Sequence, residues 1–216
     1  MRRPKQAQAK DRRPATARGA ATRARIVEAA ADLVHRQGAR ATSLDDIMAA
    51  SATSKSQLYH YFAGKDALMR AVIELQTARV TGGQAALLGR VDSLAGLRRW
   101  RNRVVAMNKA VRGAGGCPLG SLASELADRS ENARKMLAHG FAQWESHLVG
   151  SLRAMHERGE LKRDAKPEDL ATAAIAALEG GLLLAQTTRA SRPLELALDM
   201  AIAHIARFSI RANVRV

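Results

Sequence analysis

The side chains best suited to chemistry in this sequence lie close together between Ser54 and Lys65. The run begins Ser-Lys-Ser-Gln and continues with Tyr59, His60 and Tyr61, so it offers hydroxyl, ammonium, amide and imidazole groups. Such groups bond to phosphate oxygens and to base edges in the grooves of duplex DNA. The pattern predicts a binding surface rather than a catalytic one. The predicted DNA contacts are Thr42, Ser43, Thr53, Ser54, Lys55, Ser56, Gln57, Tyr59, His60, Tyr61 and Lys65.

Two short helices must position these side chains. Ser43 is a good N-cap for the first helix, whose apolar residues fall on one face and which ends near residues 50–51. Ser54 can cap the second helix, residues 55–62, which Gly64 follows. Two helices of about two turns each, joined by a tight turn, make a helix-turn-helix whose second helix can enter the major groove.

The order and spacing of residues 22–75 resemble the amino-terminal domain of the TetR/AcrR family of transcriptional regulators. The stretches ARIVEAAADLVHRQGARATSLDDIM and SKSQLYHYFAGKDAL carry the resemblance. The matching residues are Ile26, Ala29, Ala30, Leu33, Gly38, Thr42, Ser43, Ile47, Ser54, Leu58, Tyr59, Tyr61, Phe62, Lys65, Ala67 and Leu68. Where the family usually has Gly-Val-Ser in the turn, this chain has Ala52-Thr53-Ser54. Since alanine tolerates a positive φ poorly, the turn is expected either to avoid that region or to be strained.

Composition favours an all-α protein. Of 216 residues, 47% are hydrophobic and only 3% aromatic, with much Ala and Leu and no alternating strand pattern. The single cysteine, Cys117, excludes an intrachain disulfide framework and is typical of a reducing compartment. No apolar stretch approaches the roughly 20 residues of a membrane span, and the basic N-terminus lacks the apolar segment of a secretory signal. We therefore expect a cytoplasmic protein without a membrane partner.

Positive charge is concentrated at the N-terminus. The net charge is +15, and residues 1–25 hold nine Lys and Arg against Asp11 alone, which gives +8. Residues 26–70 hold five basic and five acidic residues and are neutral. The sequence predicts that the basic segment assists DNA binding through phosphate or minor-groove contacts, with a steep salt dependence. The alternative is a solubilising tail.

We expect three parts: a basic disordered arm (1–20), a three-helix helix-turn-helix DNA-binding domain (21–66) and a larger helical domain for effector binding and dimerisation (67–216). The helix that starts near Lys65 is expected to break around Gly82-Gly83 or at Gly89. Further helices are predicted over 93–112, 118–127 and 130–159, and from Pro167 and Pro193 onward.

The last two predicted helices have wide apolar faces that one protomer cannot easily cover. The resemblance implies that they pair with their twins in a four-helix homodimer interface, and two reading helices about 34 Å apart would suit a palindromic operator. The alternative is that these faces only complete the core of one protomer. The predicted interface residues are Leu170, Ala174, Gly181, Leu182, Leu198, Ile202 and Ile205.

Both tryptophans fall in the middle of the larger domain, where the resemblance implies an apolar cavity for a small molecule. Apolar clefts with aromatic walls commonly bind ligands, although ordinary core packing is the alternative for each residue. Arg98, Arg99, Arg101 and Arg103 could attract an anionic effector or form a solvated face. Cys117 is either a thiol sensor or a small buried apolar residue. The predicted ligand-binding residues are Trp100, Met107, Cys117, Leu122, Met136, Phe141, Trp144 and Leu178.

No catalytic or metal-binding pattern stands out. His139 and His147 are eight residues apart, about 12 Å along a helix, too far to share one ion. The sequence has no nucleophile elbow, phosphate-binding glycine loop or carboxylate pair. We therefore expect no enzyme activity, metal or cofactor. The predicted function is a ligand-responsive DNA-binding regulator, and the resemblance implies a repressor released from its operator by an unidentified effector. The alternative is an effector-independent DNA-binding or architectural protein.

Overall fold

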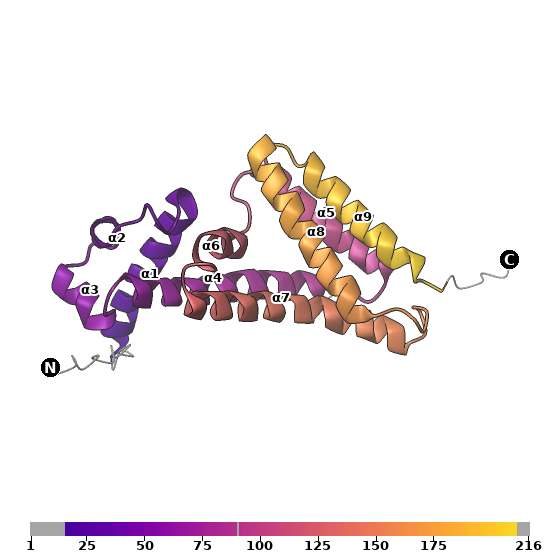
Figure 1. The fold of residues 1–216 in the computed structure, drawn as a ribbon, viewed down its shortest axis with the longest axis horizontal. Helices are drawn as coiled ribbons and strands as arrows, with labels where there is room; N and C mark the ends of the chain where they lie inside the picture. The colour runs from indigo at the N-terminus through magenta and orange to yellow at the C-terminus, as the bar shows by residue number, and fades with distance from the viewer. Residues whose placement is uncertain (1–15, 90, 211–216) are drawn as a thin grey trace. The chain divides into compact units, whose positions relative to one another are not determined.

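The computed structural model describes residues 16–89 and 91–210, and within these ranges the chain forms nine α-helices and no strand (Figure 1). The predicted all-α class is confirmed. The helices are α1 (Ala17–Gln37), α2 (Leu44–Ser51), α3 (Lys55–Tyr61), α4 (Lys65–Leu88), α5 (Leu94–Ala110), α6 (Pro118–Leu126), α7 (Glu131–Glu157), α8 (Pro167–Thr188) and α9 (Arg192–Arg207).

The chain divides into two compact units. One comprises Met1–Gln76 and Leu122–Met136, and the other comprises Thr77–Ser121 and Leu137–Val216. The units therefore do not follow a single cut after residue 66, because most of α6 and the start of α7 pack with α1–α3.

The first unit contains α1, which starts at Ala17, four residues before the predicted start of the DNA-binding domain at residue 21. The Thr16 side chain caps it by accepting a hydrogen bond from the Gly19 N–H, and Gly38, with a φ of 88°, follows its last residue. Residues 17–20 of the predicted arm are thus helical and Thr16 caps them, while residues 1–15 lie outside the described residues. Ile26, Ala30 and other apolar residues of α1 are fully buried.

Ser43 and Ser54 cap the two helices of the helix-turn-helix as the sequence predicts, and each is part of a capping box. In α2 the Ser43 Oγ accepts from the Asp46 N–H at 3.0 Å while the Asp46 carboxylate accepts from the Ser43 N–H at 2.9 Å. Ser54 and Gln57 repeat the pattern in α3, at 3.2 and 2.9 Å. Each box satisfies two backbone donors that a helix start leaves open, so the register of both helices is fixed locally.

The turn between α2 and α3 is strained in the way that the sequence suggests. Ala52 adopts φ 49° and ψ 48°, the left-handed region, and its side chain is exposed. We therefore expect Ala52→Gly to raise the free energy of unfolding by about 1 kcal/mol, because glycine adopts this region without a steric cost. Urea unfolding followed by circular dichroism measures the change. A variant no more stable than the wild type would show that the turn stores no strain.

In the second unit, α4 continues through Gly82-Gly83 and ends at Leu88, so Gly89 is the correct one of the two predicted breaks. The side chain of Ser93 caps α5, and Pro118 and Pro167 begin α6 and α8 as predicted. The helix α9 starts at Arg192, one residue before the predicted Pro193. Figure 1 shows α5, α8 and α9 lying side by side, and α9 packs on both of the others.

The sequence predicts no membrane span, and α8 is the described helix whose length and composition bear on this prediction. Its 22 residues have a mean hydropathy of 1.4 over an 18-residue window, so by length and composition it could cross a membrane. Its Leu, Ala and Ile residues account for this, and its small Ala and Gly residues let α8 pack closely on α9. A Cβ on Gly181 would lie 2.9 Å from the Leu194 Cα. One helix of this length and composition is weak evidence for a membrane span, because the core helix of a soluble protein can have the same length and composition.

Candidate functional site

The helix α3 and its N-cap residue present six of the eleven predicted DNA contacts as exposed side chains. Its core side is anchored by Leu58 and by Phe62, which follows the helix, and both are completely buried. The Tyr59 side chain is 48% exposed, so its ring and hydroxyl are available on this surface. Ser54, Lys55, Ser56, Gln57 and His60 are also exposed.

Three of the predicted DNA contacts are instead buried. The Thr42 hydroxyl donates to the Gly38 carbonyl at 2.8 Å, and the Thr53 hydroxyl lies 2.7 Å from that of Ser51. Tyr61 is only 8% exposed and meets the His60 ring edge-on. Buried polar groups need hydrogen-bond partners, and the two threonines find theirs within the domain. The three residues therefore stabilise the turn and the helices.

Other predicted contacts already have a structural task. The Gln57 Oε1 accepts the Ser54 N–H of the capping box, so only its amide N–H groups can donate elsewhere. The Lys65 ammonium lies 3.4 Å from the Arg40 carbonyl. Lys55 has no ion-pair partner among the described residues, so its charge is available to a phosphate.

No sequence pattern indicates a role for Glu125, which the fold brings to the end of α1. Its carboxylate accepts hydrogen bonds from the Ala39 and Arg40 N–H groups at 3.1 and 3.0 Å. Because 85 residues or more separate the partners, no local pattern could show this contact. These two hydrogen bonds connect α6 to the loop that leads into α2, and Glu125 and that loop both belong to the first unit.

A cavity of about 370 Å³ lies in the second unit and has mainly apolar walls. Four of the eight predicted ligand-binding residues line it: Met107, Cys117, Trp144 and Leu178. Trp144 is 1% exposed, and the Phe141 ring stacks against it with 6.4 Å between ring centroids. A volume of this size suits a small organic molecule.

The other four predicted ligand-binding residues do not line this cavity. Trp100 borders a neighbouring cavity, and its indole N–H donates to the Gln84 Oε1 at 3.1 Å. Phe141 stacks on Trp144 and does not itself line the cavity. Leu122 and Met136 belong to the first unit. The sequence did not indicate the contribution of α4, which supplies Val80, Gly83, Gln84 and Leu87, because a helix break at Gly82-Gly83 was one of the expected outcomes.

Cys117 is placed as a buried apolar residue rather than as a reactive thiol. Burial raises the pKa of its thiol, and the neighbouring Glu179 carboxyl raises it further. Burial also raises the pKa of Glu179, whose Oε1 is buried without a hydrogen-bond partner. A thiol that resists ionisation is a poor nucleophile.

We expect Glu179→Gln to stabilise the protein increasingly as the pH rises above the ordinary glutamate pKa of 4.5. A carboxyl with a raised pKa in the folded state holds its proton more tightly there than in the unfolded chain. Its contribution is therefore complete at low pH and is lost as the pH rises through the folded-state pKa. Thermal unfolding from pH 4 to pH 8 measures the difference. A melting-temperature difference that does not change with pH would contradict this placement of Glu179.

The predicted dimer-interface residues lie inside the protomer. Leu170, Ala174, Leu198, Ile202 and Ile205 are each at most 8% exposed, Gly181 packs on Leu194, and Leu182 lines the cavity. The exposed sides of the same two helices carry other large apolar residues. Leu183 and Leu184 on α8 are 63% and 54% exposed, and Leu196 and Met200 on α9 are 51% and 66% exposed. We call these four residues the α8–α9 patch.

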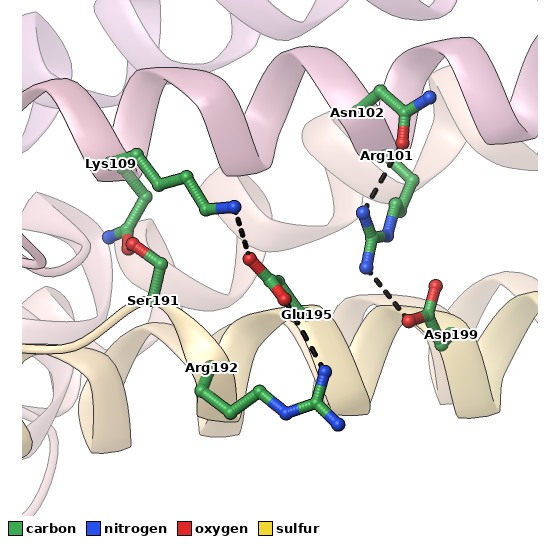
Figure 2. A network of polar contacts seen from close by, with 8 residues as sticks. Arg101, Asn102, Lys109, Ser191, Arg192, Glu195 and Asp199 are labelled. Atoms are coloured by element: carbon green, nitrogen blue, oxygen red, sulfur yellow. Dashed lines mark hydrogen bonds and ion pairs between the residues drawn. The ribbon is translucent and has the colours of Figure 1, made fainter.

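Ion pairs tie α9 to α5, as Figure 2 shows. Lys109 lies 2.6 Å from Glu195, which also faces Arg192 at 3.5 Å, and Arg101 lies 2.8 Å from Asp199. The hydrogen bond from Lys109 lowers the pKa of Glu195. Arg101, one of the four arginines of the predicted basic cluster, is therefore neutralised within the protomer. Among the described residues, no group of three His, Cys, Asp or Glu side chains could hold a metal ion.

Comparison with known proteins gives two family matches that cover most of the chain. Residues 26–72 match the model for bacterial regulatory proteins of the tetR family, and residues 93–201 match the model for tetracyclin repressor-like C-terminal domains. A helix-turn-helix transcriptional regulator encoded in the lacX 3′ region of Lactococcus lactis is 30% identical over 184 residues, 83% of this chain and 90% of that protein.

Two further relatives agree with these matches. The transcriptional repressor DhaR of Mycobacterium sp. strain GP1 is 27% identical over 173 residues, 80% of this chain and 86% of that protein. The crystal structure of the regulatory protein TetR from Rhodobacter sphaeroides superposes with a TM-score of 0.72 at 26% identity, over 85% of this chain and 98% of that one.

Proposed function

This chain belongs to the TetR family of bacterial regulatory proteins, and on that basis we propose that it is a dimeric transcriptional repressor that a small-molecule effector releases from its operator. The family and its relatives are DNA-binding transcriptional regulators, not enzymes. Repression, the effector and the dimer are the parts that we propose for this chain.

The observation that carries the proposal is the distribution of exposed large apolar side chains. Soluble proteins rarely expose such residues in groups unless the surface binds something. Among the described residues, eight large apolar side chains are exposed, and seven of these eight lie on three surfaces. Tyr59 lies on α3, Met107 and Val111 line the cavity, and the other four form the α8–α9 patch. A DNA-binding regulator controlled by an effector needs these three surfaces.

For DNA binding we propose that α3 enters the major groove and that Lys55, Ser56, Tyr59 and His60 are its principal contacts. The exposed capping residues Ser43, Ser54 and Gln57 lie at the starts of α2 and α3, and they can also reach the DNA. The basic arm, of which residues 1–15 lie outside the described residues, would add phosphate contacts and so increase the salt dependence of binding.

For dimerisation we propose the α8–α9 patch in place of the residues expected from the sequence. A symmetric dimer would bury the patch against its copy and place two α3 helices on a palindromic operator. Such a protein acts on chromosomal DNA, and its one cysteine is a buried thiol. We therefore propose a cytoplasmic location.

The test is binding of the full chain to DNA from upstream of its own gene, followed by fluorescence anisotropy, with and without small molecules that raise its melting temperature. We expect a specific dissociation constant of about 10⁻⁸ M or tighter, and release of the DNA by at least one stabilising molecule. If DNA binding is specific but no stabilising molecule weakens it, the alternative of an effector-independent DNA-binding protein is correct.

A further inference from the structure

The cavity in the second unit continues toward a second hollow along the groove between α4 and α5. The second hollow, of about 460 Å³, is lined by Ala86, Leu87, Gly96, Arg99, Trp100 and Arg103. Leu87 borders both spaces, so they adjoin at this residue. The first space is mainly apolar, whereas the second has two arginines beside a tryptophan. A ligand that extends along the groove would therefore meet an apolar region and a cationic one.

The polar groups that line the first cavity are oriented as donors. The Trp100 indole N–H can only donate, so the Gln84 side chain must turn its carbonyl oxygen to it, and the Gln84 amide N–H groups remain. Asn108 is 6% exposed, and its Oδ1 accepts from the Ser191 hydroxyl at 2.7 Å, which leaves its amide N–H groups as donors. A ligand that satisfies these groups must offer acceptor atoms.

The charges along the groove have one sign. Arg79 lines the first cavity, and Arg99 and Arg103 line the second. Neither space is lined by a described Asp or Glu residue. Arg99 lies 3.7 Å from Asp92 in an exposed pair, which contributes little, and Arg103 has no ion-pair partner among the described residues. The groove therefore favours a negatively charged ligand.

We propose that the effector is an amphipathic monoanion of the carboxylate type. The carboxylate accepts from the Gln84 amide and faces Arg99 and Arg103, while the apolar body packs on Val104, Leu178 and Leu182. A dianion such as a phosphate monoester fits less well, because the apolar walls would leave most of its oxygen atoms without donors. This inference rests on the proposed function, since it concerns the cavity that we assign to the effector.

Matched pairs of probes test the ligand class: 4-phenylbutyrate against 4-phenylbutyramide, and octanoate against octanamide. Intrinsic tryptophan fluorescence reports binding, because Trp144 and Trp100, the two tryptophans of the chain, border the two spaces. We expect each carboxylate to bind the full-length protein about tenfold or more tightly than its amide, since charge-assisted hydrogen bonds exceed neutral ones. Equal or weaker binding of the carboxylates, or no binding of either at millimolar concentration, would overturn the proposal.

The variant Gln84→Glu sharpens this test. It keeps an acceptor for the Trp100 indole but replaces the amide donor with a carboxylate, so it should remove the preference for carboxylates and leave amide binding nearly unchanged. Arg103→Gln should weaken only the carboxylates. Arg98→Gln, on the same helix but lining neither space, is the matched control and should change nothing. If Gln84→Glu and Arg98→Gln both leave the preference intact, the proposed carboxylate site is wrong.

The same titrations on the protein bound to its upstream DNA separate this inference from the proposed function. Carboxylates that bind selectively without releasing the DNA support the ligand class and contradict the proposed function. Amides that bind as tightly as carboxylates and release the DNA support regulation by an effector and overturn the ligand class.

Discussion

Leu184→Glu is expected to convert the protein into a monomer and to lower its operator affinity about a hundredfold or more. Leu184 is 54% exposed within the α8–α9 patch, so a glutamate there costs one protomer little, but it would place two buried like charges in a symmetric interface. A monomer places only one α3 on the operator and loses the gain from the second half-site. Sedimentation velocity and fluorescence anisotropy on the same samples measure the two effects.

The matched control for this prediction is Ala142→Glu, which adds the same charge at an exposed position of α7. It should remain dimeric and bind DNA like the wild type. A Leu184→Glu protein that stays dimeric would show that the α8–α9 patch is not the interface. A monomer with full operator affinity would show that dimerisation is not needed for DNA binding.

Gly83→Leu is expected to prevent the effector from releasing the DNA while leaving DNA binding intact. Gly83 lines the cavity, and a Cβ on it would meet nothing within 4 Å. We therefore expect a leucine to fill part of the cavity without disturbing the protomer. It should also stabilise α4 by about 1 kcal/mol, because glycine is the poorer helix former. Release of the upstream DNA by a molecule active on the wild type is the measurement.

The neighbouring Gly82 provides the control. A Cβ on Gly82 also meets nothing within 4 Å, but this residue does not line the cavity. Gly82→Leu should gain the same stability and keep the wild-type response to the effector. If both variants respond like the wild type, the effector does not occupy this cavity. If neither responds, stiffening of α4 rather than filling of the cavity is responsible.

The sequence predicted the helix-turn-helix closely because its determinants are local. Ser43 and Ser54 each cap a helix through a partner three residues away, and both boxes are present in the structure. The strain at Ala52 could likewise be anticipated from a turn that lacks its usual glycine. Prolines and a capping serine marked the starts of α5, α6 and α8 for the same reason.

The binding surfaces of the second unit could be predicted only in part. Apolar spacing along α8 and α9 identifies helices with wide apolar faces, but it does not say which residues a protomer covers itself. Leu198 and Met200 look alike in the sequence, yet the first is completely buried and the second is 66% exposed. Likewise, the sequence does not distinguish Trp100 from Trp144. The packing of α4 decides that Trp144 lines the first cavity and Trp100 lines the neighbouring one.

The exposed side chains of α3 provide the most direct test of the account. Fluorescence anisotropy on upstream DNA would compare the wild type with the double variant Lys55→Ala/Tyr59→Ala and with Lys162→Ala, an exposed lysine of the second unit. We expect the double variant, with unchanged helix content, to lose about a hundredfold or more in affinity and to have a shallower salt dependence, whereas Lys162→Ala should bind normally. A folded double variant that binds the DNA as tightly as the wild type would contradict the claim that α3 contacts DNA.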